Sequence, residues 1–116
     1  MKITAICCEN SGWKAAGSIH DGALMQTVDL LRVPCAGRIE VGTILKAFEN
    51  GADKVLVAGC PIDNCKFVRG NRRGLKRVAA ARQALKDAGI DENKLRIELI
   101  SSVDGHKLAA ILREMQ

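Results

Sequence analysis

Residues 3–8, Ile-Thr-Ala-Ile-Cys-Cys, form a short apolar stretch that is followed at once by the polar run 9–12, Glu-Asn-Ser-Gly. A short apolar run that ends in turn-forming residues is typical of a strand buried on both faces. Residues 54–59, Lys-Val-Leu-Val-Ala-Gly, form another predicted strand, which leads directly into Cys60. Buried strands of this kind are found mainly in parallel sheets covered by helices, so the stretch 3–8 predicts an α/β fold.

Two further strands and four helices are expected around these stretches. The strand 29–33 ends before Pro34, because proline has no N–H to donate to a ladder and restricts the residue before it. Residues 95–100 alternate apolar and charged side chains, as a half-exposed edge strand does. Helices are expected at 13–19, 40–50, 73–88 and 104–114; Gly51 and Gly89 close the second and third, and Gly70-Asn71 forms a turn before the third. The alternation predicts a four-stranded parallel sheet of Rossmann or flavodoxin-like type, in an order such as 2-1-3-4, with helices on both faces.

Length and composition favour one domain over residues 1–116. The chain is 47% hydrophobic, 27% charged and only 3% aromatic, which suits a compact aliphatic α/β domain and argues against base stacking. It has neither a secretory signal pattern nor an apolar stretch of the roughly 20 residues that span a bilayer. We therefore expect a cytoplasmic protein that does not enter a membrane. Thiols stay reduced there, so a set of cysteines is more often metal-binding or catalytic than disulfide-bonded.

The formal net charge of +5 comes largely from one basic segment, residues 66–86, which contains no acidic residue. Its members are Lys66, Arg69, Arg72, Arg73, Lys76, Arg77, Arg82 and Lys86. Such a face can dock an acidic protein, bind nucleic acid, or be a solvated helix surface. Charge alone does not separate these three functions.

All five cysteines lie at the end of a predicted strand or in the loop just after it: Cys7, Cys8, Cys35, Cys60 and Cys65. In the order 2-1-3-4 the carboxyl ends of these strands meet at the crevice where the chain switches direction. Four thiolates are the usual ligands of a two-iron or four-iron cluster. Cys7 and Cys8 would point to opposite faces of the sheet, and Cys8 is nearer the loop. We therefore predict Cys8, Cys35, Cys60 and Cys65 as metal ligands, with Cys7 as the alternate ligand.

Other interpretations of the cysteines stay open. A single buried cysteine is often only a small hydrophobic residue of the core. Zinc is a lesser option, because paired Cys-x2-Cys motifs are absent. A metal-free cysteine redox enzyme or sulfur carrier could use Cys60 and Cys65 as a redox pair, or Cys35 as a nucleophile activated by Arg38. His20 and His106 are expected at the surface, and no Gly-x-Gly-x-x-Gly or P-loop motif indicates a nucleotide.

Three segments of the sequence resemble a known family. They are the end of the first strand followed by Asn10-Ser11-Gly12-Trp13, the segment Pro34-Cys35-Ala36-Gly37-Arg38-Ile39, and Gly59-Cys60 to Cys65 followed by Gly70-Asn71. Over nearly its whole length the chain is similar to the delta subunit of methyl-viologen-reducing hydrogenases. Members of that family are iron-sulfur subunits found with heterodisulfide-reductase-type complexes. Many of its members carry a second cysteine where Ser11 stands and a histidine where Pro61 stands. If that cysteine were a necessary ligand, the cluster here would be incomplete or Cys7 would substitute for it.

The resemblance implies one [2Fe-2S] cluster and the transfer of single electrons. The implied partners are a hydrogenase or dehydrogenase module and a flavoprotein subunit like heterodisulfide reductase A. The chain would then be a non-catalytic electron-transfer subunit of an oxidoreductase complex. Its basic segment would dock an acidic partner, and nucleic acid is not an expected ligand.

Overall fold

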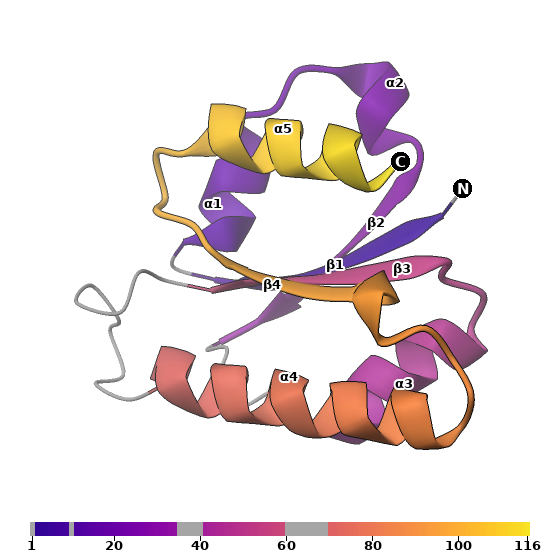
Figure 1. The fold of residues 1–116 in the computed structure, drawn as a ribbon. Coiled ribbons are helices and arrows are strands. Elements are labelled where there is room, and N and C mark those ends of the chain that lie inside the picture. Colours follow the sequence, from indigo (N-terminus) through magenta and orange to yellow (C-terminus); the bar gives the residue numbers. More distant parts are fainter. Residues whose placement is uncertain (1, 10, 35–40, 60–69) are drawn as a thin grey trace.

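A computed structural model of the protein describes residues 2–9, 11–34, 41–59 and 70–116 (Figure 1). Its centre is a four-stranded sheet with the order β2-β1-β3-β4, in which every neighbouring pair is parallel. The strands are β1 (Ile3–Cys8), β2 (Val28–Val33), β3 (Lys54–Gly59) and β4 (Leu95–Leu99). The predicted fold class and strand order are confirmed.

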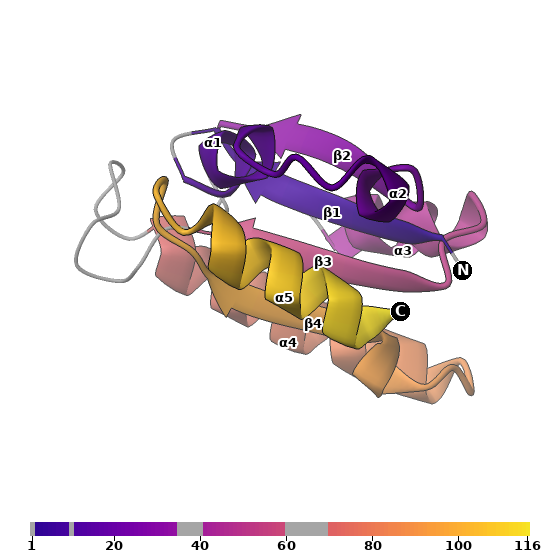
Figure 2. The same cartoon turned by 90° about the horizontal axis from the view of Figure 1, so that it is seen from above.

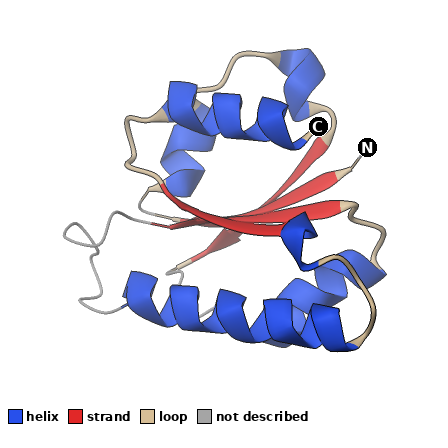
Figure 3. Cartoon of the chain, viewed as in Figure 1, coloured by secondary structure: helices blue, strands red, loops and turns tan. Residues whose placement is uncertain are grey.

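Helices cover both faces of the sheet (Figures 1 and 3). One face carries α1 (Gly12–Gly17), α2 (Gly22–Met25) and α5 (Gly105–Met115), and the other carries α3 (Val41–Glu49) and α4 (Gly70–Asp87). Figure 2 shows α1, α2 and α5 together on the near side of the sheet. No helix within the described ranges is long and apolar enough to cross a membrane.

Several element ends differ from the predicted ones. Helix α4 begins at Gly70, so the turn predicted at Gly70-Asn71 is wrong. Glycine is well tolerated at a helix start, which is why this pair does not delay the helix. Helix α2 and the short 3₁₀ helix η3 (Glu92–Lys94) were not predicted, because four and three residues are too few to show a helical period. Gly51 and Gly89 have φ values of 100° and 78°, which confirms them as the glycines that close α3 and α4.

Two apolar cores lie on the two faces of the sheet. The α1/α5 core contains Ile3, Ala5 and Cys7 of β1 together with Leu56, Ala58, Leu108 and Leu112. The α3/α4 core contains Ile6 of β1 together with Ile44, Val55, Val57, Val78, Leu85 and Leu95. Successive side chains of β1 therefore alternate between the cores, as a strand requires. This alternation separates the two adjacent cysteines that end β1.

Arg82 belongs to the predicted basic segment, but its guanidinium forms hydrogen bonds within the protein. Its Nε and Nη2 atoms donate to the carbonyl oxygen of Leu95 at 3.0 and 2.8 Å. Leu95 is the first residue of β4 and is fully buried. The Arg82 side chain therefore attaches α4 to the start of the edge strand.

An Arg82→Met variant is expected to lose about 1–2 kcal/mol of unfolding free energy, because the Leu95 carbonyl loses both donors while the apolar stem is kept. Urea denaturation of the reduced protein, followed by circular dichroism, measures this loss. Lys86→Met is the matched control, since Lys86 is exposed on the same helix. It should change the unfolding free energy by less than about 0.5 kcal/mol. Equal losses in the two variants would contradict a structural role for Arg82.

Candidate metal centre

The predicted ligands lie in the sequence at or just after the carboxyl ends of β1, β2 and β3. In the sheet register Cys8 is paired with Val33 of β2, and Cys7 is paired with Ala58 of β3. Pro34 follows Val33 and directly precedes Cys35 in the sequence, and Gly59 ends β3 directly before Cys60. Cys35, Cys60 and Cys65 themselves lie outside the described residues. Cys8 therefore ends β1, which lies between β2 and β3, the strands whose ends lead to Cys35 and Cys60 in the sequence.

The Cys8 side chain is buried at this edge and lies beside the end of β2. Only 2% of its surface is exposed, and its Sγ is 4.0 Å from the carbonyl oxygen of Pro34. The backbone N–H of Glu9 donates to the Val33 carbonyl at 2.8 Å, which continues the ladder one residue beyond β1. The Cys8 thiol is thus held next to the residue that precedes Cys35.

Cys7 has a different environment. It is fully buried in the α1/α5 core, and its Sγ is 3.7 Å from the carbonyl oxygen of Ala5 within the same strand. Burial, and secondarily the neighbouring Cys8, raises the pKa of the Cys7 thiol to about 12. This environment is that of a protonated thiol within an apolar core.

The connection from β1 to α1 brings Ser11 and Gly12 to the same edge. The Ser11 N–H donates to the Cys8 carbonyl at 3.2 Å, and the Ser11 carbonyl accepts from Ala15 N–H at 2.9 Å. The Ser11 side chain is only 2% exposed, and its Oγ has no hydrogen-bond partner among the described residues. A Cβ added at Gly12 would lie 2.7 Å from both the Cβ and the carbonyl oxygen of Ala58. The sequence predicted neither the buried Ser11 hydroxyl nor the close approach of Gly12 to Ala58. Both depend on contacts with distant residues, which leave no pattern in the local sequence.

Trp13 and the two histidines occupy other surroundings. Trp13 is partly buried against the α1/α5 core, and the Arg32 guanidinium of β2 lies 5.3 Å from the centre of its ring, within cation–π range. His20 and His106 are exposed, as predicted, and line a groove of about 430 Å³ beside α5. No three His, Cys, Asp or Glu side chains gather as a metal site within the described ranges. A metal centre at the sheet edge would therefore need Cys35, Cys60 or Cys65.

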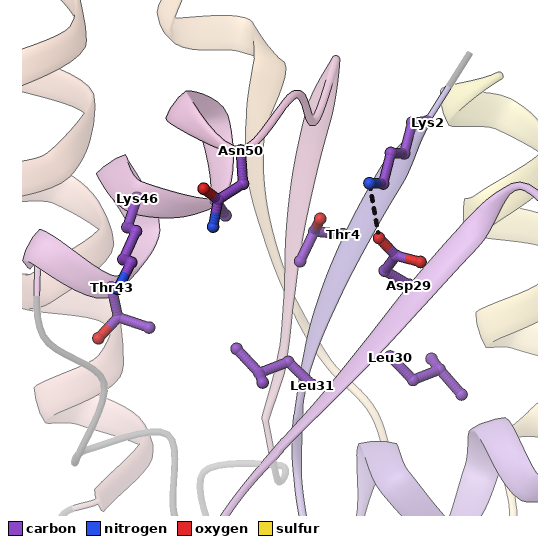
Figure 4. Close-up of a pocket in the computed structure, with 9 residues that line it drawn as sticks. Lys2, Thr4, Asp29, Leu30, Leu31, Thr43, Lys46 and Asn50 are labelled. Atoms are coloured by element: carbon purple, nitrogen blue, oxygen red, sulfur yellow. Dashed lines mark ion pairs between the residues drawn. The ribbon is translucent and has the colours of Figure 1, made fainter.

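A separate groove of about 260 Å³ lies between the sheet and α3 (Figure 4). Lys2 and Thr4 reach it from the amino end of β1, and the Lys2 ammonium forms a 3.0 Å ion pair with Asp29. Thr43 and Lys46 of α3 line the opposite side. No cysteine lines this groove, and it lies at the other end of β1 from Cys8. It is therefore not part of the candidate metal centre.

Comparison with known proteins agrees with the resemblance seen in the sequence. The family model described as methyl-viologen-reducing hydrogenase, delta subunit, matches residues 3–116. The iron-sulfur subunit of an F420-non-reducing hydrogenase of Archaeoglobus profundus is 36% identical over 115 residues, which cover 97% of this chain and 83% of the relative. The vhu iron-sulfur subunit of an F420-non-reducing hydrogenase of Methanopyrus kandleri is 35% identical over 115 residues, covering 97% and 87% of the two chains.

A second kind of relative is much longer than this chain. A ferredoxin:CoB-CoM heterodisulfide reductase subunit of Methanosarcina mazei is 34% identical over 87 residues, covering 75% of this chain and 11% of the relative. A segment similar to this chain is thus a small part of that reductase subunit. The match to residues 3–116, together with the hydrogenase iron-sulfur relatives, places the whole described fold within one family. The chain belongs to the methyl-viologen-reducing hydrogenase delta subunit family.

Proposed function

We propose that the protein is an electron-transfer subunit that holds one [2Fe-2S] cluster at the carboxyl edge of its sheet. The observation that carries this proposal is the buried Cys8 thiol, which lies between the strand ends that lead to Cys35 and Cys60 in a chain of this family. The names of the hydrogenase relatives describe them as iron-sulfur subunits. When bound, such a cluster accepts and releases one electron at a time. The whole chain, residues 1–116, would act as one iron-sulfur domain without bond chemistry of its own.

The proposed ligands are Cys8, Cys35, Cys60 and Cys65. Soft thiolate donors suit an iron-sulfur centre, and the thiol described at the edge fits that donor set. Cys8 is preferred over Cys7 because its Sγ lies against the end of β2, whereas the Cys7 side chain packs inside the α1/α5 core. The sheet would shield the Cys8 side of the cluster from water.

The proposed partners are a hydrogenase or dehydrogenase module and a flavoprotein like heterodisulfide reductase A. The similarity to the heterodisulfide reductase chain of Methanosarcina mazei supports the second partner, because a segment like this chain occurs within that protein. Helix α4 exposes Lys76 and Lys86, while Arg82 is held by Leu95. We propose that the exposed lysines of α4 contact an acidic surface of a partner.

Anaerobic reconstitution of the full chain with iron and sulfide tests this function. We expect about two irons and two labile sulfides per chain, and a signal in electron paramagnetic resonance after one-electron reduction. A chain that binds no iron under these conditions would overturn the proposal. About four irons per chain would overturn the two-iron assignment while leaving an iron-sulfur function.

A further inference from the structure

Ser11 lies at the point where the chain changes direction across the sheet. From β1 the chain passes through α1 and α2 to β2 on one side, whereas from β3 it passes through α4 to β4 on the other side. In open α/β sheets, ligands bind beside the switch between two such strands. The hydrogen bond from Ser11 N–H to the Cys8 carbonyl fixes this residue at the end of β1. The contact of Gly12 with Ala58 brings the same turn against β3.

Among the described residues, Ser11 is a polar residue buried together with apolar ones. Within those ranges, its Oγ is the one buried side-chain oxygen or nitrogen without a hydrogen-bond partner. Leaving a buried hydroxyl unpaired costs its full desolvation free energy, and most buried polar groups are therefore paired. The hydroxyl of Ser18, the residue directly after α1, in contrast donates to the Ala15 carbonyl at 2.8 Å. The Ser11 hydroxyl thus has a free donor at the edge where the cluster is proposed.

We propose that the Ser11 hydroxyl donates a hydrogen bond to a thiolate or sulfide sulfur of the cluster and thereby raises its reduction potential. This inference rests on the proposed function. The four proposed thiolates are a complete ligand set, so the Ser11 hydroxyl is not required as a ligand and can keep its proton as a hydrogen-bond donor. A reduced cluster carries one more negative charge than the oxidised cluster. An O–H donor therefore stabilises the reduced form more strongly.

The experiment compares Ser11→Ala with Ser18→Ala in the full chain, both with and without the reconstituted cluster. In the cluster-loaded protein, Ser11→Ala is expected to shift the reduction equilibrium about tenfold toward the oxidised form, which is about 59 mV in midpoint potential for one electron. Ser18→Ala should leave the midpoint potential unchanged. Redox titration followed by electron paramagnetic resonance measures both variants.

Stability of the cluster-free protein separates this role from a structural one. Ser11→Ala should keep or raise the melting temperature of the cluster-free chain, because no hydrogen bond within the protein is lost. Ser18→Ala should lower it. Equal midpoint potentials in wild type and Ser11→Ala, or a destabilised cluster-free Ser11→Ala chain, would overturn the inference. Failure of the wild-type chain to bind iron would instead overturn the proposed function on which it rests.

Discussion

A Cys8→Ala variant is expected to retain less than about a tenth of the iron that the wild-type chain binds on anaerobic reconstitution. Loss of an outer-shell contact alone costs about 10–100-fold in metal affinity, and loss of a direct ligand costs at least as much. Cys8 is placed for this role because it is the last residue of β1 and its Sγ lies 4.0 Å from the carbonyl oxygen of Pro34, the residue directly before Cys35.

Cys7→Ala is the matched control, since it removes the same atom from the adjacent residue. It should leave the iron content close to two per chain, because the Cys7 side chain packs in the α1/α5 core. It should lower the unfolding free energy by about 0.5–1.5 kcal/mol, as deletion of one buried heavy atom does in other cores. Iron and sulfide analysis is paired with urea denaturation of each cluster-free variant, so that a folding defect is not mistaken for a lost ligand. If Cys7→Ala loses the iron and Cys8→Ala keeps it, the assignment of the two residues is reversed.

The architecture could be predicted from the sequence because its signals are local and repeated. The apolar runs at 3–8 and 54–59 coincide with β1 and β3, and the alternation of strands and helices predicts a parallel sheet for which 2-1-3-4 is one expected order. The same alternation along β1 predicted that Cys7 and Cys8 point to opposite faces. The family resemblance was also visible, since its motifs are short contiguous segments.

Features that depend on contacts between distant residues could not be predicted in this way. Arg82 was counted with the basic segment, but its guanidinium is bound by the Leu95 carbonyl, 13 residues further along the chain. The unpaired Ser11 hydroxyl is likewise a property of its burial, and nothing in residues 9–12 distinguishes it from an exposed turn serine. The sequence predicted that Cys7 and Cys8 point to opposite faces of the sheet. It could not show the core that surrounds Cys7, because that core includes residues of α5 at the far end of the chain.

Gly12 is the other position at which a small change should have a large effect. A Gly12→Ala substitution is expected to lower the unfolding free energy by about 1–3 kcal/mol, which is the usual cost of overpacking a close contact. The new Cβ would lie 2.7 Å from both the Cβ and the carbonyl oxygen of Ala58, a fully buried residue of β3. Backbone atoms cannot turn aside as a flexible side chain can, so α1 would have to move away from the sheet. Urea denaturation of the cluster-free, reduced chain measures the loss.

Gly17→Ala at the other end of α1 tests whether steric contact, and not the loss of a glycine, causes this effect. A Cβ at Gly17 would meet no atom within 4 Å, and its φ lies outside the left-handed region. Alanine there should leave the unfolding free energy unchanged or raise it by up to about 1 kcal/mol, because alanine has less backbone freedom to lose on folding. The two variants add the same methyl group to the same helix. A loss of unfolding free energy in Gly12→Ala without a loss in Gly17→Ala therefore isolates the contact with Ala58. Equal changes in unfolding free energy would mean that Gly12 does not lie as close to Ala58 as the structure shows. The turn that holds Ser11 beside Cys8 would then not be fixed by this contact.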